Sequence, residues 1–269
     1  MSASLPVRTV AKPWGMDVLP APFVAPAGER IGEIWFEPPA DLPELLVKYI
    51  FTSEKLSVQV HPSDAQTLAK GIGRQGKEEC WLIVDAQPGA TLGIGFDQPI
   101  DEDAMREAAR DGSIEQRMTW HAVAPGDFFY IPANTVHAIG AGVSLIEVQQ
   151  NSDITYRLFD YGRPRELHLE EGMAVSRGEI YDLARWSKRV APAQTQVLVD
   201  GPLFVLDQLA GFPDAVTRSR FPGACLVIPR EGALTVRGEA LLPGGCACVA
   251  SLSDVVFDEA GTCLLARAA

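Results

Sequence analysis

The chain has 269 residues, of which 47% are hydrophobic and 22% are charged. This length is enough to bury one substantial core or two smaller cores joined together. The formal net charge is -12, and such an excess of negative charge repels nucleic acid and anionic lipid, which bind clustered Lys and Arg. Composition therefore predicts a globular protein whose partner is neither nucleic acid nor a membrane.

The start of the chain and its cysteines indicate the compartment. Residues 1–6 lack the basic start and the apolar run of about 7–15 residues that a secretion signal needs. No stretch approaches the roughly 20 apolar residues of a membrane span. The cysteines are odd in number and lack paired zinc-knuckle spacing; they are Cys80, Cys225, Cys246, Cys248 and Cys263. We therefore expect reduced thiols and a cytoplasmic protein, with Cys246 and Cys248 on one apolar face of a strand.

Short strand-like runs begin the pattern of elements. The first are residues 45–51 and 56–60, both apolar and bounded by turn-forming residues. Ser63 can then cap a helix over residues 64–70, and Gly71 can end it in a left-handed conformation. The sequence thus predicts two strands followed by a short helix.

The same alternation continues through the middle of the chain. A strand over residues 80–84 precedes a helix over residues 101–110, which has an acidic start and a stop at Asp111 and Gly112. Further strand-like runs follow, at residues 127–131 and 144–149. Many short strands with few helices between them favour an antiparallel jelly roll or sandwich over βαβ units. We expect an all-β dominated barrel with a few short helices outside it.

Beyond residue 190 the sequence indicates a second, smaller β lobe. Residues 190–194 contain a proline and are typical of a connector. Strand-like runs resume after it, at residues 196–199 and 203–209. We therefore predict a domain of residues 1–190 and a C-terminal lobe of residues 191–269. In that lobe Gly244 begins a turn and strand like those that follow Gly126, but without a histidine, which indicates a degenerate half-barrel.

Histidine is scarce, so a metal site can be built from it in few ways. The four histidines are at positions 61, 121, 137 and 168. Residues 56–61 alternate in polarity, which places Gln59 and His61 on the same face of a strand. Two donor side chains that converge in this way form half of a metal site. His121 and His168 have no such companion, and we expect them to be surface or core residues.

A carboxylate and another imidazole lie further along the chain. Residues 76–81 lead into a strand and offer Glu79 as a ligand, with Glu78 pointing to the opposite face. A later strand ends in a proline-containing turn that presents His137 at the start of the next strand. Asn134 suits the left-handed position of this turn almost as well as glycine would. These residues predict the same pocket as the first half-site.

One motif here resembles the second metal-binding motif of the cupins; its residues are Gly126, Pro132, Asn134 and His137. The first half of the site differs from most cupins, because Gln59 stands where a His is common and Glu79 lies far from His61. These departures resemble the type I mannose-6-phosphate isomerases (phosphomannose isomerases). In that family a Gln-x-His pair, a Glu after a Lys, and a later His hold zinc.

Four segments carry this resemblance most strongly: residues 46–62, 76–81, 132–140 and 147–157. Shorter matches at residues 13–15 and 31–35 extend it to roughly residues 12–170. The chain is similar in length to the short bacterial form of the family. The resemblance implies a cupin barrel that interconverts mannose 6-phosphate and fructose 6-phosphate, an aldose–ketose isomerisation through an enediolate.

The resemblance also implies roles for individual residues. The implied zinc ligands are Gln59, His61, Glu79 and His137. Arg157 matches an arginine with a catalytic role, and Lys77 matches a lysine beside the substrate. Ser57 matches a serine associated with the phosphate, and Glu147 falls at an acidic position of the same motif.

The chemistry explains why such residue types are needed. Moving a carbonyl between C1 and C2 requires loss of a proton beside the carbonyl and stabilisation of the enediolate charge. A Lewis-acidic metal and the Arg157 guanidinium can supply that stabilisation. Zinc suits mixed nitrogen and oxygen ligands, as Mn, Co or Fe also would. Glu147, Lys77 or a metal-bound water could be the base.

Several alternatives remain open at this point. A phosphorylated substrate requires a local basic pocket, and the candidates to line it are Lys48, Lys55, Lys77 and Arg157. Arg157 could instead pair with Asp153 or Asp160, and Ser57 could face outward. The substrate could be free mannose or another sugar phosphate, or the chain could be a non-catalytic cupin that binds a sugar or metal. A homodimer is also left open.

Overall fold

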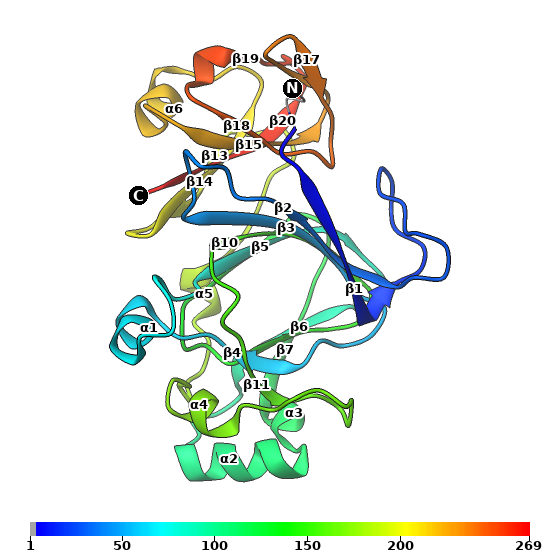
Figure 1. Cartoon of the computed structure of the whole chain (residues 1–269), viewed down its shortest axis with the longest axis vertical. Coiled ribbons are helices and arrows are strands. Elements are labelled where there is room, and N and C mark those ends of the chain that lie inside the picture. Colours follow the sequence, from blue (N-terminus) through cyan, green and yellow to red (C-terminus); the bar gives the residue numbers. More distant parts are fainter. Residues whose placement is uncertain (1–3) are drawn as a thin grey trace.

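A computed structural model describes residues 4–269 and is dominated by antiparallel β sheet. Figure 1 shows its layers stacked along the long axis: the C-terminal sheets, a large central sheet, a second sheet below it, and helices at the far end. The expected all-β cupin barrel with a few short helices and a smaller C-terminal β lobe is confirmed. None of the helices in the described range is long and apolar enough to cross a membrane.

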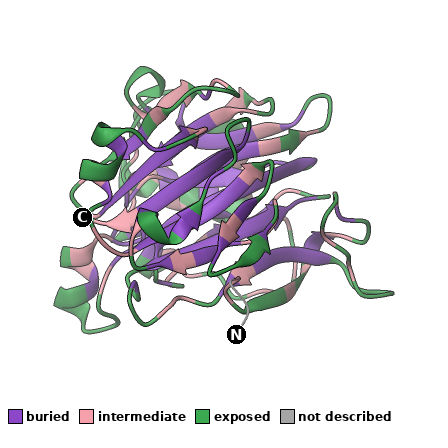
Figure 2. Ribbon diagram, turned by 90° about the horizontal axis from the view of Figure 1, so that it is seen from above, coloured by how far each residue is buried: buried purple, intermediate pink, exposed green. Residues whose placement is uncertain are grey.

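The central layer is a seven-stranded sheet that forms one wall of the barrel. In spatial order its strands are β1 (Val7–Met16), β2 (Ile31–Phe36), β3 (Leu45–Phe51), β10 (Val143–Gln150), β5 (Glu79–Ala86), β8 (Asp127–Ile131) and β12 (Ser187–Arg189). Every residue of β3 and β10 is buried, because layers cover both faces of this sheet (Figure 2). This two-sided burial explains why both strands are apolar runs rather than strictly alternating ones.

The facing wall of the barrel is a five-stranded sheet. Its order is β11 (Tyr156–Phe159), β4 (Val58–Val60), β9 (His137–Ile139), β6 (Thr91–Phe96) and β7 (Met118–Ala122). Between the two walls lies an apolar cluster that includes Trp81, Ile94 and Leu145. Strand alternation sends Phe129 into this cluster and Phe128 to the cluster on the opposite face, so both are core residues.

The two predicted helices form where their caps indicated. Helix α1 (Asp64–Lys70) has Ser63 as N-cap in a capping box with Gln66, and Gly71 ends it in a left-handed conformation. Helix α2 (Glu102–Asp111) has Asp101 as N-cap, and Gly112 ends it. Helix α2 packs its apolar side on the outer face of the five-stranded sheet, through residues such as Met105.

Four shorter helices were not predicted from sequence: α3 (Ile114–Arg117), α4 (Leu169–Met173), α5 (Leu183–Trp186) and α6 (Ala215–Arg220). Each has four to six residues, fewer than two full turns, so its apolar residues cannot establish a helical period. Caps were the available signal, since Asp182 and Asp214 accept the first-turn hydrogen bonds of α5 and α6.

The C-terminal part of the chain builds two further sheets. One has the order β13 (Gln196–Asp200), β14 (Phe204–Ala210), β20 (Thr262–Ala268), β15 (Cys225–Glu231) and β18 (Ala247–Val249), and the other has β17 (Glu239–Leu241), β16 (Leu234–Val236) and β19 (Val255–Val256). A short 3-10 helix, Leu252–Asp254, precedes β19. The first of these sheets packs on the seven-stranded sheet through one apolar cluster that includes Phe36, Tyr49, Leu206 and Leu264. A domain boundary at residue 190 remains a prediction, because this cluster contains residues from both before and after that position.

The cysteines behave as small apolar residues. All five are free, and Cys246 and Cys248 both contact the cluster between the sheets, as expected, although only Cys248 lies on a strand, because β18 begins at Ala247. Gly126 and Gly244 have left-handed φ values of 92° and 90°, and each precedes a strand. A degenerate repeat of the first barrel stays a prediction that this local likeness does not test.

Candidate metal centre and its cavity

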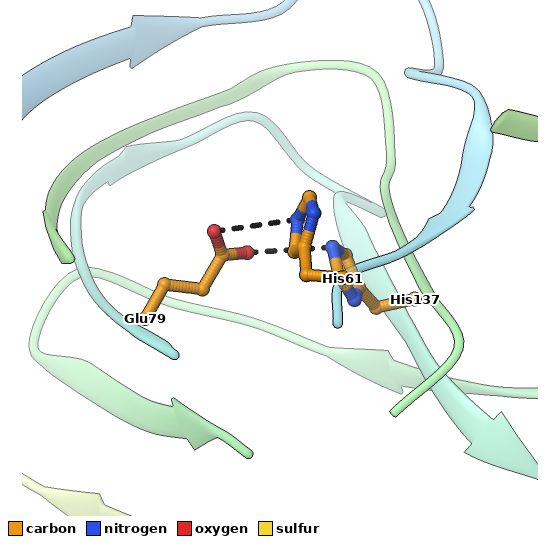
Figure 3. Close-up of side chains that lie close together, drawn as sticks. All are labelled: His61, Glu79 and His137. Carbon is orange, nitrogen blue, oxygen red and sulfur yellow. Dashed lines mark ion pairs between the residues drawn. The ribbon is translucent and has the colours of Figure 1, made fainter. Parts of the chain in front are cut away.

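Three side chains that are distant in sequence converge inside the barrel. Figure 3 shows the Glu79 carboxylate facing the rings of His61 and His137. Glu79 Oε2 lies 3.5 Å from His61 Nε2, and Oε1 lies 3.3 Å from His137 Nε2. All three residues are at most 2% exposed, and their donor atoms lie within 4.8 Å of one another. This arrangement is a potential metal site.

Backbone carbonyls orient both imidazoles toward this centre. His61 Nδ1 lies 2.9 Å from the carbonyl oxygen of Ile154, and His137 Nδ1 lies 2.9 Å from that of Thr135. A carbonyl can only accept, so each Nδ1 carries the proton and each Nε2 presents a lone pair. Metal-binding histidines are typically held in this way.

The turn before His137 is fixed by contacts to the His61 segment. Asn134 has the left-handed φ of 73° that its position predicted. Its backbone N–H donates to the carbonyl of His61 at 2.8 Å, and its Nδ2 donates to Gln66 Oε1 at 2.7 Å. The cap of α1 and this turn therefore hold both imidazoles together.

Gln59 lies beside the three residues. It pairs in register with His137 across β4 and β9, and its Nε2 is 3.3 Å from His137 Nε2. Ser57 Oγ donates to Gln59 Oε1 at 3.3 Å. Rotating the amide by 180° would exchange its two ends, pointing the oxygen at the centre and the NH2 at Ser57. The side chain is thus placed to supply an oxygen donor.

Burial keeps the imidazoles in the form that binds metals. Burial, and next the positive charge of Lys77, place the pKa of His61 well below its ordinary value. Burial also lowers the pKa of His137, although Glu79 opposes this. Burial alone would raise the pKa of Glu79, but Lys77 and His137 together outweigh it and the pKa is lowered. Neutral imidazoles and an ionised carboxylate result.

Lys77 contacts the same centre. Its Nζ lies 2.6 Å from Glu79 Oε2 and 3.1 Å from His61 Nε2, and the residue is 5% exposed. Lys77 offsets part of the charge of Glu79, but within residues 4–269 neither carboxylate oxygen accepts a well-aligned hydrogen bond. A coordinating cation would stabilise a buried carboxylate in this state further, so the donor set fits a divalent metal.

A cavity of about 300 Å³ opens beside the centre. Its volume suits a small polar ligand such as a sugar phosphate. Five cationic side chains line it against three acidic ones: Lys12, Lys48, Lys77, Arg157 and Arg165 against Glu33, Glu147 and Asp153. The cavity is therefore locally basic within an acidic protein, as an anionic ligand requires.

Glu147 is held firmly inside this cavity. Its Oε1 accepts from Lys48 Nζ at 2.9 Å and its Oε2 accepts from Trp81 Nε1 at 3.0 Å. The carboxylate and its lysine are both buried. Two fixed donors on one carboxylate restrict its orientation, which suits a group that must meet a reacting atom.

Arg157 and Ser57 also line the cavity. The alternative pairing of Arg157 with Asp153 or Asp160 is wrong, because no carboxylate in residues 4–269 lies within ion-pair distance of its guanidinium. Arg157 Nη1 instead donates to the carbonyl of Glu166 at 2.8 Å. Its buried Nε has no hydrogen-bond partner among the residues that the structure describes. Burial, and next the charge of Arg165, lower the pKa of Arg157. The outward reading of Ser57 is also wrong, since the residue is 2% exposed.

Other sequence expectations have mixed outcomes. Lys55 does not line the cavity; it pairs with Glu115 and lies over the ring of Trp120. Lys12 and Arg165 do line it but were not singled out, because neither has a spacing that links it to a histidine. His121 and His168 lie outside the metal-site cluster, as expected.

Comparison with known proteins adds independent evidence, although no family model matches the chain. Mannose-6-phosphate isomerase ManA of Bacillus subtilis is 43% identical over 137 residues, covering 49% of this chain and 43% of the relative. Mannose-6-phosphate isomerase of Streptococcus mutans is 37% identical over 169 residues, covering 60% and 53%. The chain is similar in sequence to proteins named mannose-6-phosphate isomerase. It spans about half the length of these curated relatives.

Solved structures of mannose-6-phosphate isomerases have the same fold over nearly the whole chain. The Bacillus subtilis mannose 6-phosphate isomerase superimposes with a TM-score of 0.77 at 21% identity, covering 98% of both chains. A variant of phosphomannose isomerase from Salmonella typhimurium gives 0.67 at 13% identity, covering 99% of this chain and 100% of the other. The likeness in fold therefore extends over nearly the whole chain, beyond the 49% and 60% of it that the two sequence matches cover.

Proposed function

We propose that this protein is a metal-dependent isomerase that interconverts mannose 6-phosphate and fructose 6-phosphate. The observation that carries the proposal is a buried cluster of His61, Glu79 and His137 whose neighbours, Gln59 and Lys77, line a cation-rich cavity. The similarity to mannose-6-phosphate isomerases agrees with this assignment.

The metal would be held by His61, Glu79 and His137, with Gln59 as a fourth ligand. Zinc fits this set best, because imidazole nitrogens and carboxylate or amide oxygens suit its borderline character. A bound zinc ion would supply a Lewis acid that stabilises negative charge on substrate oxygens.

The remaining cavity residues would have two roles, which are proton transfer and stabilisation of the enediolate charge. Glu147 is proposed as the base that moves a proton between C1 and C2, since Lys48 and Trp81 fix its carboxylate. The negative charges of Glu79 and Glu147 overcome the effect of burial on Lys77 and raise its pKa, so it stays an ammonium. Lys77 and Arg157 would then stabilise the enediolate oxygens.

Chelation and one arginine substitution test the proposal together. Removing divalent metal should abolish interconversion of mannose 6-phosphate and fructose 6-phosphate in a coupled assay, and zinc should restore it. Arg157→Ala should retain metal but lose at least about a hundredfold in kcat, as expected when a fixed charge-stabilising donor is removed.

Arg189→Ala is the matched control, because this exposed arginine forms an ion pair with Asp127 at the surface and does not line the cavity. Full activity in Arg157→Ala would contradict the catalytic assignment. Turnover of free mannose in preference to mannose 6-phosphate would indicate an isomerase of the unphosphorylated sugar. Metal binding without turnover of either sugar would indicate a non-catalytic cupin.

A further inference from the structure

A buried carboxylate lies in the loop that follows β11, behind the wall of the cavity. Asp160 is 2% exposed and contacts two arginines of its own loop. Its Oδ2 accepts from Arg165 Nε at 2.6 Å, and its Oδ1 accepts from Arg165 Nη2 at 2.6 Å. Asp160 Oδ1 also accepts from Arg163 Nη1 at 3.0 Å. A bidentate pair of this kind fixes a guanidinium in both position and plane.

This contact orients Arg165 toward the cavity. The pair uses Nε and Nη2 on one edge of the guanidinium and leaves Nη1 for another acceptor. Arg165 lines the cavity, whereas Arg163 and Asp160 do not. A ligand in the cavity can therefore contact Arg165 but not the Asp160 carboxylate that holds it.

The loop itself is anchored to the strand that carries Ser57 and Gln59. Arg163 Nη2 donates to the carbonyl of Lys55 at 2.6 Å, just before that strand. Tyr161 and Gly162 turn the chain with left-handed φ values of 56° and 77°. Asp160 therefore holds two arginines, Arg163, which anchors the loop to Lys55, and Arg165, which lines the cavity.

The same loop supports the second cavity arginine. Arg157 Nη1 donates to the carbonyl of Glu166, the residue after Arg165. Two guanidinium groups thus face one cavity while a single short loop supports both. Because Arg157 is assigned to the enediolate, Arg165 remains for the phosphate. A fixed guanidinium matches a phosphate monoester dianion better than it matches the neutral hydroxyls of a free sugar.

We propose that Asp160 is a positioning residue that holds Arg165 at the cavity, so that Arg165 selects phosphorylated over free sugar. This inference rests on the proposed function and names the determinant of its substrate class. Asp160 acts through Arg165 and does not touch the substrate.

Phosphate affinity distinguishes this role from a purely structural one. Asp160→Asn and Arg165→Gln should each raise the KM for mannose 6-phosphate, and the Kd of inorganic phosphate for the zinc-loaded protein, by about tenfold. Calorimetric titration with phosphate measures the Kd without turnover. The kcat should stay within about twofold, because the metal ligands and Glu147 are unchanged. The double variant should match Arg165→Gln alone, since Asp160 acts through that arginine.

The C-terminal lobe offers a matched control. Asp207 is also 2% exposed and binds Arg220 in the same bidentate manner, at 2.7 and 2.9 Å, but does not line the cavity. Asp207→Asn should lower the melting temperature while leaving the KM and the phosphate Kd unchanged. If Asp160→Asn behaves like Asp207→Asn, or if the effects of Asp160→Asn and Arg165→Gln simply add, the inference is overturned.

Arg165→Gln keeps the test decisive if Asp160→Asn does not fold, because this side chain is 24% exposed. Wild-type phosphate affinity in Arg165→Gln would then overturn the inference. Phosphate binding without isomerisation in the wild type would overturn the proposed function instead. Active variants with unchanged KM and Kd would overturn only the role of Asp160.

Discussion

At the scale of single residues, the site depends on which atoms of each side chain already form hydrogen bonds to groups outside the metal centre. The Nδ1 atoms of His61 and His137 are both used by backbone carbonyls, so only Nε2 can face the centre. Lys48 and Trp81 each donate to one oxygen of Glu147, which fixes the carboxylate and leaves a lone pair on each oxygen to accept a proton. Within residues 4–269 the oxygens of Glu79 accept no well-aligned hydrogen bond, which makes Glu79 the carboxylate best placed to bind a cation.

His137→Ala should remove the metal while the fold is retained. Loss of outer partners alone typically weakens metal binding by about 10- to 100-fold, so loss of a ligand should exceed a hundredfold. Zinc per chain, measured by mass spectrometry after dialysis, gives the result. His121→Ala is the control, because His121 packs between Phe129 and Tyr181 outside the cluster. Full zinc content in His137→Ala would show that the ligand set is wrong.

At the scale of elements, a turn and a helix cap act as one unit that aligns β4 with β9. Asn134 bonds to the backbone of His61 and to the capping residue Gln66. The two histidines come from different strands, so their distance is set by this junction. A local change there should alter the metal site without touching a ligand.

Asn134→Ala should destabilise the protein by about 2 kcal/mol, because alanine in a left-handed conformation costs about 1–2 kcal/mol and the side-chain hydrogen bond is also lost. Metal affinity should fall with it. Asn134→Gly isolates the backbone contribution, since glycine adopts this φ freely and should recover most of the stability. Urea unfolding with and without zinc measures both effects. Equal stability of the alanine and glycine variants would refute the backbone argument.

At the scale of the whole molecule, the C-terminal sheets cover the outer face of the seven-stranded sheet. The shared cluster places Phe36 and Tyr49 of the barrel against Leu206 and Leu264 of the C-terminal part. The barrel wall that carries Glu79 and Glu147 is therefore the middle layer of the molecule (Figure 1). Its outer face is too apolar to be left in water.

A chain truncated after residue 190 should not fold cooperatively, because the apolar face of the central sheet would lose its cover. The truncated protein should bind a hydrophobic dye and lack a sharp thermal transition, whereas the full chain should show one. A cooperative transition together with zinc binding by residues 1–190 would instead establish that segment as an independent domain.

Features that depend on near neighbours in the chain could be predicted from sequence. Capping residues gave both longer helices, strand alternation placed Gln59 with His61 and separated Glu78 from Glu79, and Asn134 marked the left-handed turn. Each of these follows from the conformational preferences of a few consecutive residues. The metal-site candidates could be collected from sequence because histidines are scarce and each lies in a patterned segment.

Only the tertiary structure decided which side chains share the cavity. Lys12, Arg165 and Glu33 line it, while Lys55 lies outside. Whether a charged residue faces a cavity depends on strand pairing and on partners such as Asp160, whose contacts with Arg165 no spacing pattern encodes. The periodicity of a strand or helix shows which residues share a face. Which residues pack against that face depends on how the chain folds.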